Sequence, residues 1–216
     1  MKAGSADIPW QIRVENLSKT YNREIILKEF SHHFSTGRPT AITGSNGSGK
    51  STLLKLIAGV ILPNRGQINF FQNQEVIKEE KVFRHLTFCS PAQELVEEFT
   101  LQEMLDFHLK FRSFANGLSK SDFLAKTYFQ GHEKKKISLF SSGMKQRLKL
   151  GLALFTESGV LLLDEPTTNM DQEGIDWYRK NIINVLNDRL VIVASNQQHE
   201  YNYCEDIISM AAYKGH

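Results

Sequence analysis

The fold of this chain is decided by the stretch Gly44-Ser45-Asn46-Gly47-Ser48-Gly49-Lys50-Ser51-Thr52. An apolar run at 40–43 precedes it, and a helical pattern at 50–58, ended by Gly59, follows it. The three glycines let the backbone bend and aim N–H groups at phosphate oxygens, and the helix adds the positive end of its dipole. Strand, glycine-rich loop and helix in this order predict a nucleotide phosphate site lined by these residues. Lys50 is expected to reach the β- and γ-phosphates, and Ser51 to offer its hydroxyl to Mg²⁺.

Two acids end an apolar run further along the chain. Residues 160–165 read Val-Leu-Leu-Leu-Asp-Glu, and the carboxyl ends of buried strands carry ligand-binding groups in α/β sheets. We expect Asp164 to hold Mg²⁺, directly or through water, because Mg²⁺ usually keeps several waters. Glu165 is then free to orient or deprotonate an attacking water, which makes it the expected catalytic residue.

Short β-rich runs alternate with longer helical patterns, which is typical of an α/β domain with a mainly parallel sheet. The runs 160–163 and 190–194 are continuously apolar, as strands covered on both faces are. The run 12–17 alternates instead, with Ile12, Val14 and Asn16 on one face and Leu17 on the other, and this predicts an antiparallel layer in the N-terminal third. The expected strands are 12–17, 25–34, 39–43, 67–71, 86–90, 160–164, 190–195 and 207–211.

A helical subdomain is expected at about 97–138, inserted in this α/β core. Thr100 and Glu103 form a capping-box pattern at the start of its first helix. Asp171 can cap a later helix. The charged run 131–136 is read as a solvated loop. With 216 residues, the chain is expected to be a single domain, 1–216.

The composition excludes several classes of protein. Hydrophobic residues make up 41% of the chain, and the net charge is only +2, well short of the basic field of a dedicated nucleic-acid binder. No apolar run approaches the roughly 18 to 20 residues that cross a bilayer, and the first residues lack the apolar core of a secretory signal. The two cysteines make no disulfide framework. We therefore expect a cytoplasmic protein that binds no nucleic acid.

A further motif gives the sequence a family resemblance. The stretch Phe140-Ser141-Ser142-Gly143-Met144-Lys145-Gln146-Arg147 is similar to the signature LSGGQ followed by QR, and residues 166–171 are similar to the D-loop that follows the catalytic glutamate. From about residue 12 to 211, the chain resembles the ATP-binding subunits of ATP-binding-cassette (ABC) transporters. Its compact length is similar to that of exporter subunits, including heme-exporter-like ones. The resemblance implies a P-loop NTPase core.

The resemblance also implies how the site is completed. Two such domains sandwich two ATP molecules head to tail, so that the chain pairs with a second copy or cassette on ATP binding. Ser141, Ser142 and Gly143 would contact the γ-phosphate held by the partner, and Asp171 would contribute across the interface. Tyr21 matches the aromatic on which adenine stacks, although an aromatic there could equally be surface packing.

Two positions depart from the family pattern. Asn196 stands where the family has a histidine that contacts the γ-phosphate; an amide donates a hydrogen bond but carries no charge and shuttles no proton. Slow but present hydrolysis is the expected consequence. His199, three residues on, is an alternative substitute. Gln93 is expected to contact Mg²⁺ or water, although one extra residue separates it from the preceding proline; an ordinary exposed loop residue is the other interpretation.

The leading hypothesis for function is an ATPase subunit, with ATP and Mg²⁺, that powers a separate integral membrane permease from the inner face of the cell membrane. One alternative is a soluble ABC ATPase with an assembly or regulatory role. Another is a nucleotide-binding regulatory module with little hydrolysis, against which Glu165 argues. The transported substrate and its direction are not encoded here, because the permease makes those contacts.

Overall fold

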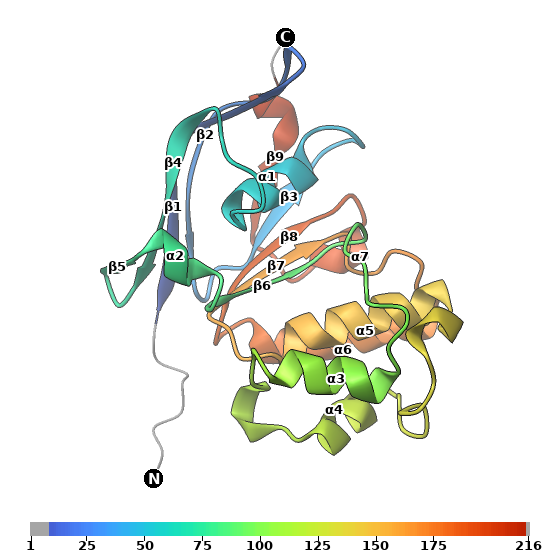
Figure 1. Cartoon of the computed structure of the whole chain (residues 1–216). Coiled ribbons are helices and arrows are strands. Elements are labelled where there is room, and N and C mark those ends of the chain that lie inside the picture. Colours follow the sequence, from blue (N-terminus) through green and yellow to red (C-terminus); the bar gives the residue numbers. More distant parts are fainter. Residues whose placement is uncertain (1–8, 215–216) are drawn as a thin grey trace.

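Two β-sheets with flanking helices organise residues 9–214, the part of the chain that the computed structural model describes (Figure 1). The antiparallel sheet lies on one side, α1 lies between it and the parallel sheet, and the remaining long helices cover the parallel sheet's far face. The expectation about a secretory signal concerns residues that fall mostly outside the described part.

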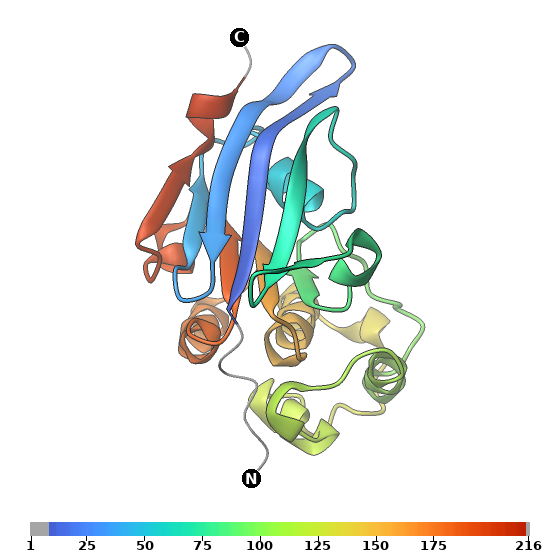
Figure 2. The same cartoon turned by 90° about the vertical axis from the view of Figure 1, so that its left-hand side faces the viewer.

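The antiparallel sheet has the strand order β2-β1-β4-β5, and Figure 2 shows it face on. Its strands are β1 (Trp10–Tyr21), β2 (Glu24–Ser35), β4 (Arg65–Gln72) and β5 (Glu75–Ile77). This confirms the predicted antiparallel layer, but the alternation predicted for β1 is wrong at its end. Asn16 has φ 50° at an irregularity in the pairing with β2, so Leu17 turns inward beside Ile12 and Val14 and all three are buried.

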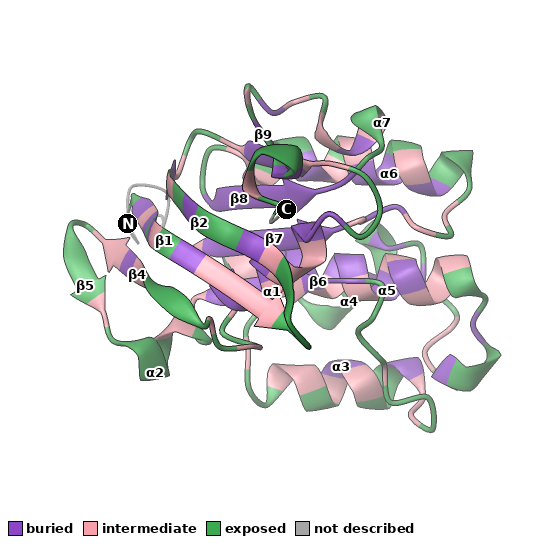
Figure 3. Cartoon of the chain, turned by 90° about the horizontal axis from the view of Figure 1, so that it is seen from above, coloured by how far each residue is buried: buried purple, intermediate pink, exposed green. Residues whose placement is uncertain are grey.

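The second sheet is wholly parallel in the order β6-β7-β8-β3-β9, which confirms the predicted α/β class. The strands are β3 (Thr40–Thr43), β6 (Leu86–Cys89), β7 (Val160–Asp164), β8 (Leu190–Ala194) and β9 (Asp206–Ser209). β7 and β8 are buried throughout, as their continuous apolar sequence predicted (Figure 3). The expected strand at 207–211 is shorter, because a 3₁₀ turn begins at Met210.

Residues 9–214 form seven α-helices. They are α1 (Lys50–Ile57), α2 (Glu79–Val82), α3 (Leu101–Leu109), α4 (Lys120–Lys126), α5 (Ser142–Phe155), α6 (Gln172–Ile182) and α7 (Gln198–Tyr201). Four of them, namely α3, α4, α5 and α6, begin directly after a residue whose side chain caps the helix. The capping box of Thr100 and Glu103 starts α3 as predicted, and Asp171 caps α6 by accepting from the Gly174 N–H. Residues 97–138 contain α3 and α4, and the charged run 131–136 is a loop.

The parallel sheet separates two hydrophobic clusters, because alternate side chains of each strand point to opposite faces. Val160 and Leu162 of β7 join the cluster formed with α1 and the antiparallel sheet. Leu161 and Leu163 join the cluster formed with α3 to α6. Within residues 9–214, none of the helices combines the length and the apolar character that a bilayer crossing needs.

Candidate nucleotide site

The carboxyl ends of four neighbouring parallel strands carry the residues predicted to bind phosphate and metal. The phosphate loop follows β3, Gln93 and the unpredicted Ser90 follow β6, Asp164 ends β7, and Asn196 comes just after β8. Since these strands are adjacent in the order β6-β7-β8-β3, their ends lie along one edge of the sheet. Ligands of α/β sheets bind at this edge. The topology therefore gathers residues that are more than a hundred positions apart in the sequence.

The phosphate loop has a shape that depends on its glycines. Gly44 has φ 144° and Gly49 has φ 97°, and both values are costly for other residues. A Cβ on Gly44 would lie 2.7 Å from Ser48 Oγ, and one on Gly49 would lie 3.0 Å from the Ile26 carbonyl oxygen. The loop thus needs glycine for space as well as for backbone conformation.

Lys50 lies over this loop from the first position of α1. Its ammonium group donates to the carbonyl oxygens of Gly44 at 2.8 Å and Ser45 at 3.3 Å, and the residue is 4% exposed. Ser48 Oγ is buried in the same loop and has no hydrogen-bond partner among residues 9–214. A buried cation beside an unpartnered hydroxyl is the donor set that a polyphosphate requires. The loop therefore fits a nucleotide phosphate.

A carboxylate and two hydroxyls form the part of the site that suits Mg²⁺. Ser51 Oγ donates to Asp164 Oδ1 at 2.9 Å, and Ser90 Oγ donates to Asp164 Oδ2 at 3.3 Å. Burial raises the pKa of Asp164, the hydrogen bond from Ser51 opposes this, and the charge of Glu165 adds to it. A divalent cation would relieve the desolvated carboxylate, and oxygen ligands are the kind Mg²⁺ prefers. Ser90 was not predicted; its position after an apolar strand was the only signal.

Glu165 follows Asp164 in a strained conformation. Its φ is 43°, in the left-handed region that non-glycine residues rarely adopt, and its N–H donates to the Ala194 carbonyl of β8 at 2.9 Å. Thr168 Oγ1 lies 3.5 Å from Glu165 Oε2. Strain of this kind persists where the surroundings hold it, often at functional sites. The side chain is partly exposed at the carboxyl edge of the sheet.

Asn196 contacts the phosphate loop directly. Its side-chain amide donates from Nδ2 to Asn46 Oδ1 at 2.9 Å, and both residues are exposed. The structure therefore brings Asn196 to the predicted phosphate site. His199 lies elsewhere, on α7, with Nε2 at 2.9 Å from Thr167 Oγ1.

Gln93 is exposed and bends back on its own loop. Its Oε1 accepts from the Ser90 N–H at 3.1 Å, so its amide is turned toward the residue that contacts Asp164. Lys149 of α5 fixes the loop by donating to the carbonyl oxygens of Ser90, Pro91 and Gln93. This arrangement joins the loop after β6 to the helix that begins at the signature stretch.

The signature residues lie at the start of α5. Ser141 caps the helix by accepting from the Met144 N–H at 3.2 Å, and both Ser141 and Ser142 are exposed. A Cβ on Gly143 would lie 3.1 Å from the Asn169 carbonyl oxygen, so this glycine permits close approach to residues 166–171. The exposed N-terminus of this helix presents free N–H groups that favour an anion.

Tyr21 lies at the end of β1 and is 44% exposed. The ammonium group of Lys19 is 4.9 Å from its ring centroid, which is cation–π geometry. No hydrogen bond in residues 9–214 joins Tyr21 to the phosphate loop, so its predicted contact with adenine stays a prediction.

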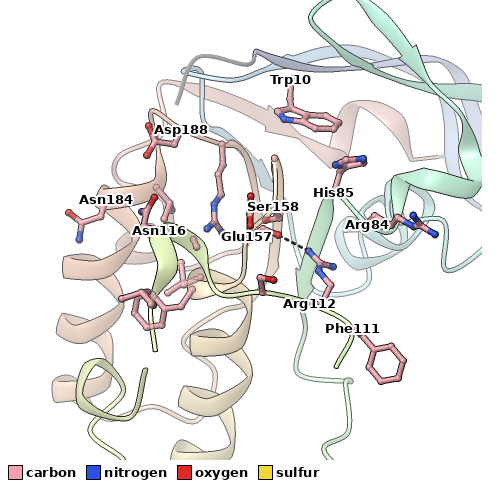
Figure 4. A pocket seen from close by; sticks show the side chains of 18 of the residues that line it. Trp10, Arg84, His85, Phe111, Arg112, Asn116, Glu157, Ser158, Asn184 and Asp188 are labelled. Atoms are coloured by element: carbon pink, nitrogen blue, oxygen red, sulfur yellow. Dashed lines mark hydrogen bonds between the residues drawn. The ribbon is translucent and has the colours of Figure 1, made fainter. Parts of the chain in front are cut away.

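A separate hollow of about 1330 Å³ lies at the opposite, amino ends of β6, β7 and β8 (Figure 4). Arg112 extends along it and donates to the carbonyl oxygens of Phe83, Leu86 and Glu157 at 2.9 to 3.2 Å. Exposed Phe111 lies at its rim. None of the predicted nucleotide-site residues lines this hollow, so it is separate from the candidate nucleotide site.

Comparison with known proteins agrees with this geometry. The sequence profile of the family described as "ABC transporter" matches residues 27–168. The chain is 29% identical over 205 residues to the uncharacterized ABC transporter ATP-binding protein YybJ of Bacillus subtilis, covering 92% of this chain and 88% of YybJ. It is 30% identical over 219 residues to the sulfate/thiosulfate import ATP-binding protein CysA of Mesorhizobium japonicum, with 93% of this chain aligned, but it spans only 61% of that protein.

A solved structure shares the fold. A dimeric ATP-binding cassette in a post-hydrolysis state, bound to ADP and Pi, superposes with a TM-score of 0.78 over 94% of each chain at 20% identity. This likeness establishes the P-loop NTPase fold. Taken with the family match over residues 27–168 and the strand-edge site, it leads to one assignment: the chain belongs to the ABC transporter family and is one of its ATP-binding subunits.

Proposed function

We propose that this chain binds ATP at the phosphate loop, hydrolyses it with Glu165, and powers a separate membrane permease. The observation that carries the proposal is the buried Lys50 and the Ser51–Asp164 hydrogen bond at one sheet edge, with Glu165 next in sequence. We take residues 1–216 as one ATPase domain, with the helical subdomain at 97–138.

Each part of the site has a role in this proposal. Lys50 and the N–H groups of residues 44–52 bind the phosphates. Mg²⁺, held by Ser51 and Asp164 with Gln93 nearby, neutralises phosphate charge when bound. Glu165 takes the proton of the attacking water, and Asn196 donates a hydrogen bond to the γ-phosphate.

The first experiment measures phosphate release by the purified chain and by Glu165→Gln. The substitution keeps size and hydrogen bonding but removes the base, so release should fall at least a hundredfold while ATP still binds. Glu205→Gln, an exposed glutamate on the loop before β9, is the matched control and should match the unaltered chain. Equal release from the chain and Glu165→Gln would refute Glu165 as the base.

Asn196 is proposed to make turnover slow. A neutral amide in place of a charged donor forgoes about 1.5–3 kcal/mol, which is about ten- to a hundredfold in rate if it acts in the transition state. Asn196→His should therefore raise phosphate release by about that factor. An unchanged rate in Asn196→His would show that this position does not limit hydrolysis.

We propose dimerisation on ATP binding, with Ser141, Ser142, Gly143 and Asp171 acting on the partner's nucleotide. The exposed α5 N-terminus supports this role, because within residues 9–214 no carboxylate accepts a hydrogen bond from its first N–H groups. Glu165→Gln with ATP should elute as a dimer in size-exclusion chromatography, and Ser142→Glu, which adds a like charge at the anion site, should elute as a monomer.

The permease is proposed to dock on the face between β6 and α3. Phe83, Phe107 and Phe111 are exposed there, and Phe107 and Phe111 pack edge to face at 5.2 Å. Exposed aromatics beside a hollow mark interaction surfaces. Such docking would hold the chain at the inner face of the membrane.

A mild-detergent pull-down of the tagged chain from its own cells tests the permease. A polytopic membrane protein should co-purify, and Phe111→Ser should reduce its yield without changing ATP hydrolysis. Ile207→Ser, on the opposite edge strand β9 and 56% exposed, is the control. Recovery with soluble partners alone would favour the soluble, non-transport ABC ATPase.

A further inference from the structure

A buried glutamate ties the end of β8 to the residues that follow Glu165. Glu200, on α7, is 1% exposed, and no cation pairs with it within residues 9–214. Its Oε1 accepts from the Thr167 N–H at 2.7 Å and from Thr167 Oγ1, and its Oε2 accepts from Ser195 Oγ. Carboxylates are almost never buried without partners, and here hydroxyls and an N–H take the place of a cation.

The Thr167 hydroxyl also fixes His199. Because this hydroxyl donates to Glu200, its oxygen is free to accept from His199 Nε2 at 2.9 Å. Two successive side chains of α7 therefore hold one threonine. The polypeptide around Thr167 has little freedom while both contacts persist.

The other flank of Thr167 is fixed from the signature helix. Gln146 of α5, itself buried, donates from Nε2 to the Pro166 carbonyl oxygen at 2.8 Å. Pro166 and Thr167 come directly after Glu165, whose φ of 43° needs support from its neighbours. The backbone that carries the proposed base is thus clamped between α7 and α5.

Ser195 extends the connection to the phosphate loop. Its N–H donates to the Ile42 carbonyl of β3 at 3.0 Å, and the next residue, Asn196, contacts Asn46. A continuous series of contacts leads from Asn46 through Asn196, Ser195, Glu200 and Thr167 to Glu165 and α5. Glu200 is its only buried carboxylate.

We propose that Glu200 is a positioning residue for hydrolysis: through Thr167 it sets the orientation of Glu165 in response to contacts at the phosphate loop. This inference rests on the proposed ATPase function of Glu165. Among the described residues no hydrogen bond joins Glu200 to the phosphate loop itself, so ATP affinity should not depend on it. Replacing Glu200 should therefore lower kcat and leave KM for ATP unchanged.

The test compares Glu200→Gln and Thr167→Val in steady-state ATP hydrolysis. Thr167→Val keeps the side chain's shape and the backbone N–H but removes the hydroxyl. Both variants should lower kcat about tenfold or more with KM within twofold. The double variant should be no slower than the slower single one, because both substitutions disrupt the same contact between Thr167 and Glu200. Thr167→Ser, which restores the hydroxyl, should recover most of kcat, and Glu205→Gln should match the unaltered chain.

Several outcomes would overturn the proposal. They are an unchanged kcat in Thr167→Val, additive losses in the double variant, and a Thr167→Ser rate as low as that of Thr167→Val. A melting curve shows whether Glu200→Gln folds. If it does not, Thr167→Val and Thr167→Ser still test the proposal. An unaltered chain no faster than Glu165→Gln would instead refute the proposed function, so the two failures are distinguishable.

Discussion

Replacing Asp164 by asparagine should make the free protein more stable and the nucleotide-bound protein less so. Burial raises the pKa of this carboxyl in the folded chain, although Ser51 and Ser90 donate hydrogen bonds to it. Between the unfolded and the folded pKa, the folded chain holds a proton that the unfolded chain has released. At neutral pH the carboxylate is ionised in both states, and the ionised form is less favourable in the folded chain, so it costs stability. Asparagine keeps an oxygen for Ser51 and offers Ser90 an N–H without that charge.

The sign of the effect follows from linkage. Asp164→Asn removes a buried charge and keeps hydrogen-bond partners, so it should raise the free energy of unfolding of the free protein at pH 7, by on the order of 1 kcal/mol. In a domain of this size, about 1 kcal/mol moves Tm by roughly 2–4 °C. The gain should be present at pH 7. It should shrink as the pH falls through the raised pKa of the folded chain and vanish below the unfolded value of 3.8, where both states are protonated.

Thermal melts with and without Mg-ATP measure both halves of the prediction. A ligand at a hundred times its Kd stabilises the folded chain by about 2.7 kcal/mol, and Asp164→Asn should lose most of that increment. Asp164→Asn should therefore melt at a higher temperature than the unaltered chain without Mg-ATP, and at a lower temperature with it. A free variant that melts below the unaltered chain at pH 7, or one that gains equally from Mg-ATP, would refute the account of Asp164.

Two further substitutions test the packing around the site. Burial lowers the pKa of His108 to about 4, and the charge of Arg112 adds to the effect. As the pH falls from 6.5 toward 4, the unaltered chain should therefore lose up to about 3 kcal/mol of folding stability relative to His108→Gln. Denaturant unfolding at several pH values measures this loss. A Cβ on Gly159 would lie 2.0 Å from Trp10 Nε1, so Gly159→Ala should cost about 1–3 kcal/mol by overpacking. Trp10→Leu should recover part of that loss in chemical denaturation; a neutral Gly159→Ala would contradict the close packing.

The elements that the sequence predicted best are those in which one local signal dominates. Continuous apolar runs predicted β7 and β8 with at most one residue of error, and the Thr100 capping box predicted the start of α3. β5, Glu75–Ile77, was missed because three residues at a sheet edge carry no periodicity. The inward turn of Leu17 depends on pairing between β1 and β2, which no local pattern encodes.

The candidate site divides in the same way. The phosphate loop and Asp164 are contiguous motifs, and their spacing alone placed them at strand ends. Glu200 could not be found, since Gln198-His199-Glu200 reads as a solvated polar turn, and its burial arises only when β7 and β8 lie side by side. The relation between Gln93 and Ser90 likewise depends on loop conformation rather than on sequence spacing.

The exposed contact between Asn196 and Asn46 separates the speed of the enzyme from its ability to fold. Both side chains lie beyond the last buried residues of their strands, so exchanging Asn196 should change stability by no more than about 0.5 kcal/mol. The rate of hydrolysis should respond far more strongly. Fast and slow forms of this chain could accordingly be made and maintained at the same cellular level, and natural selection could adjust the pace of ATP consumption through one codon without disturbing the sheet.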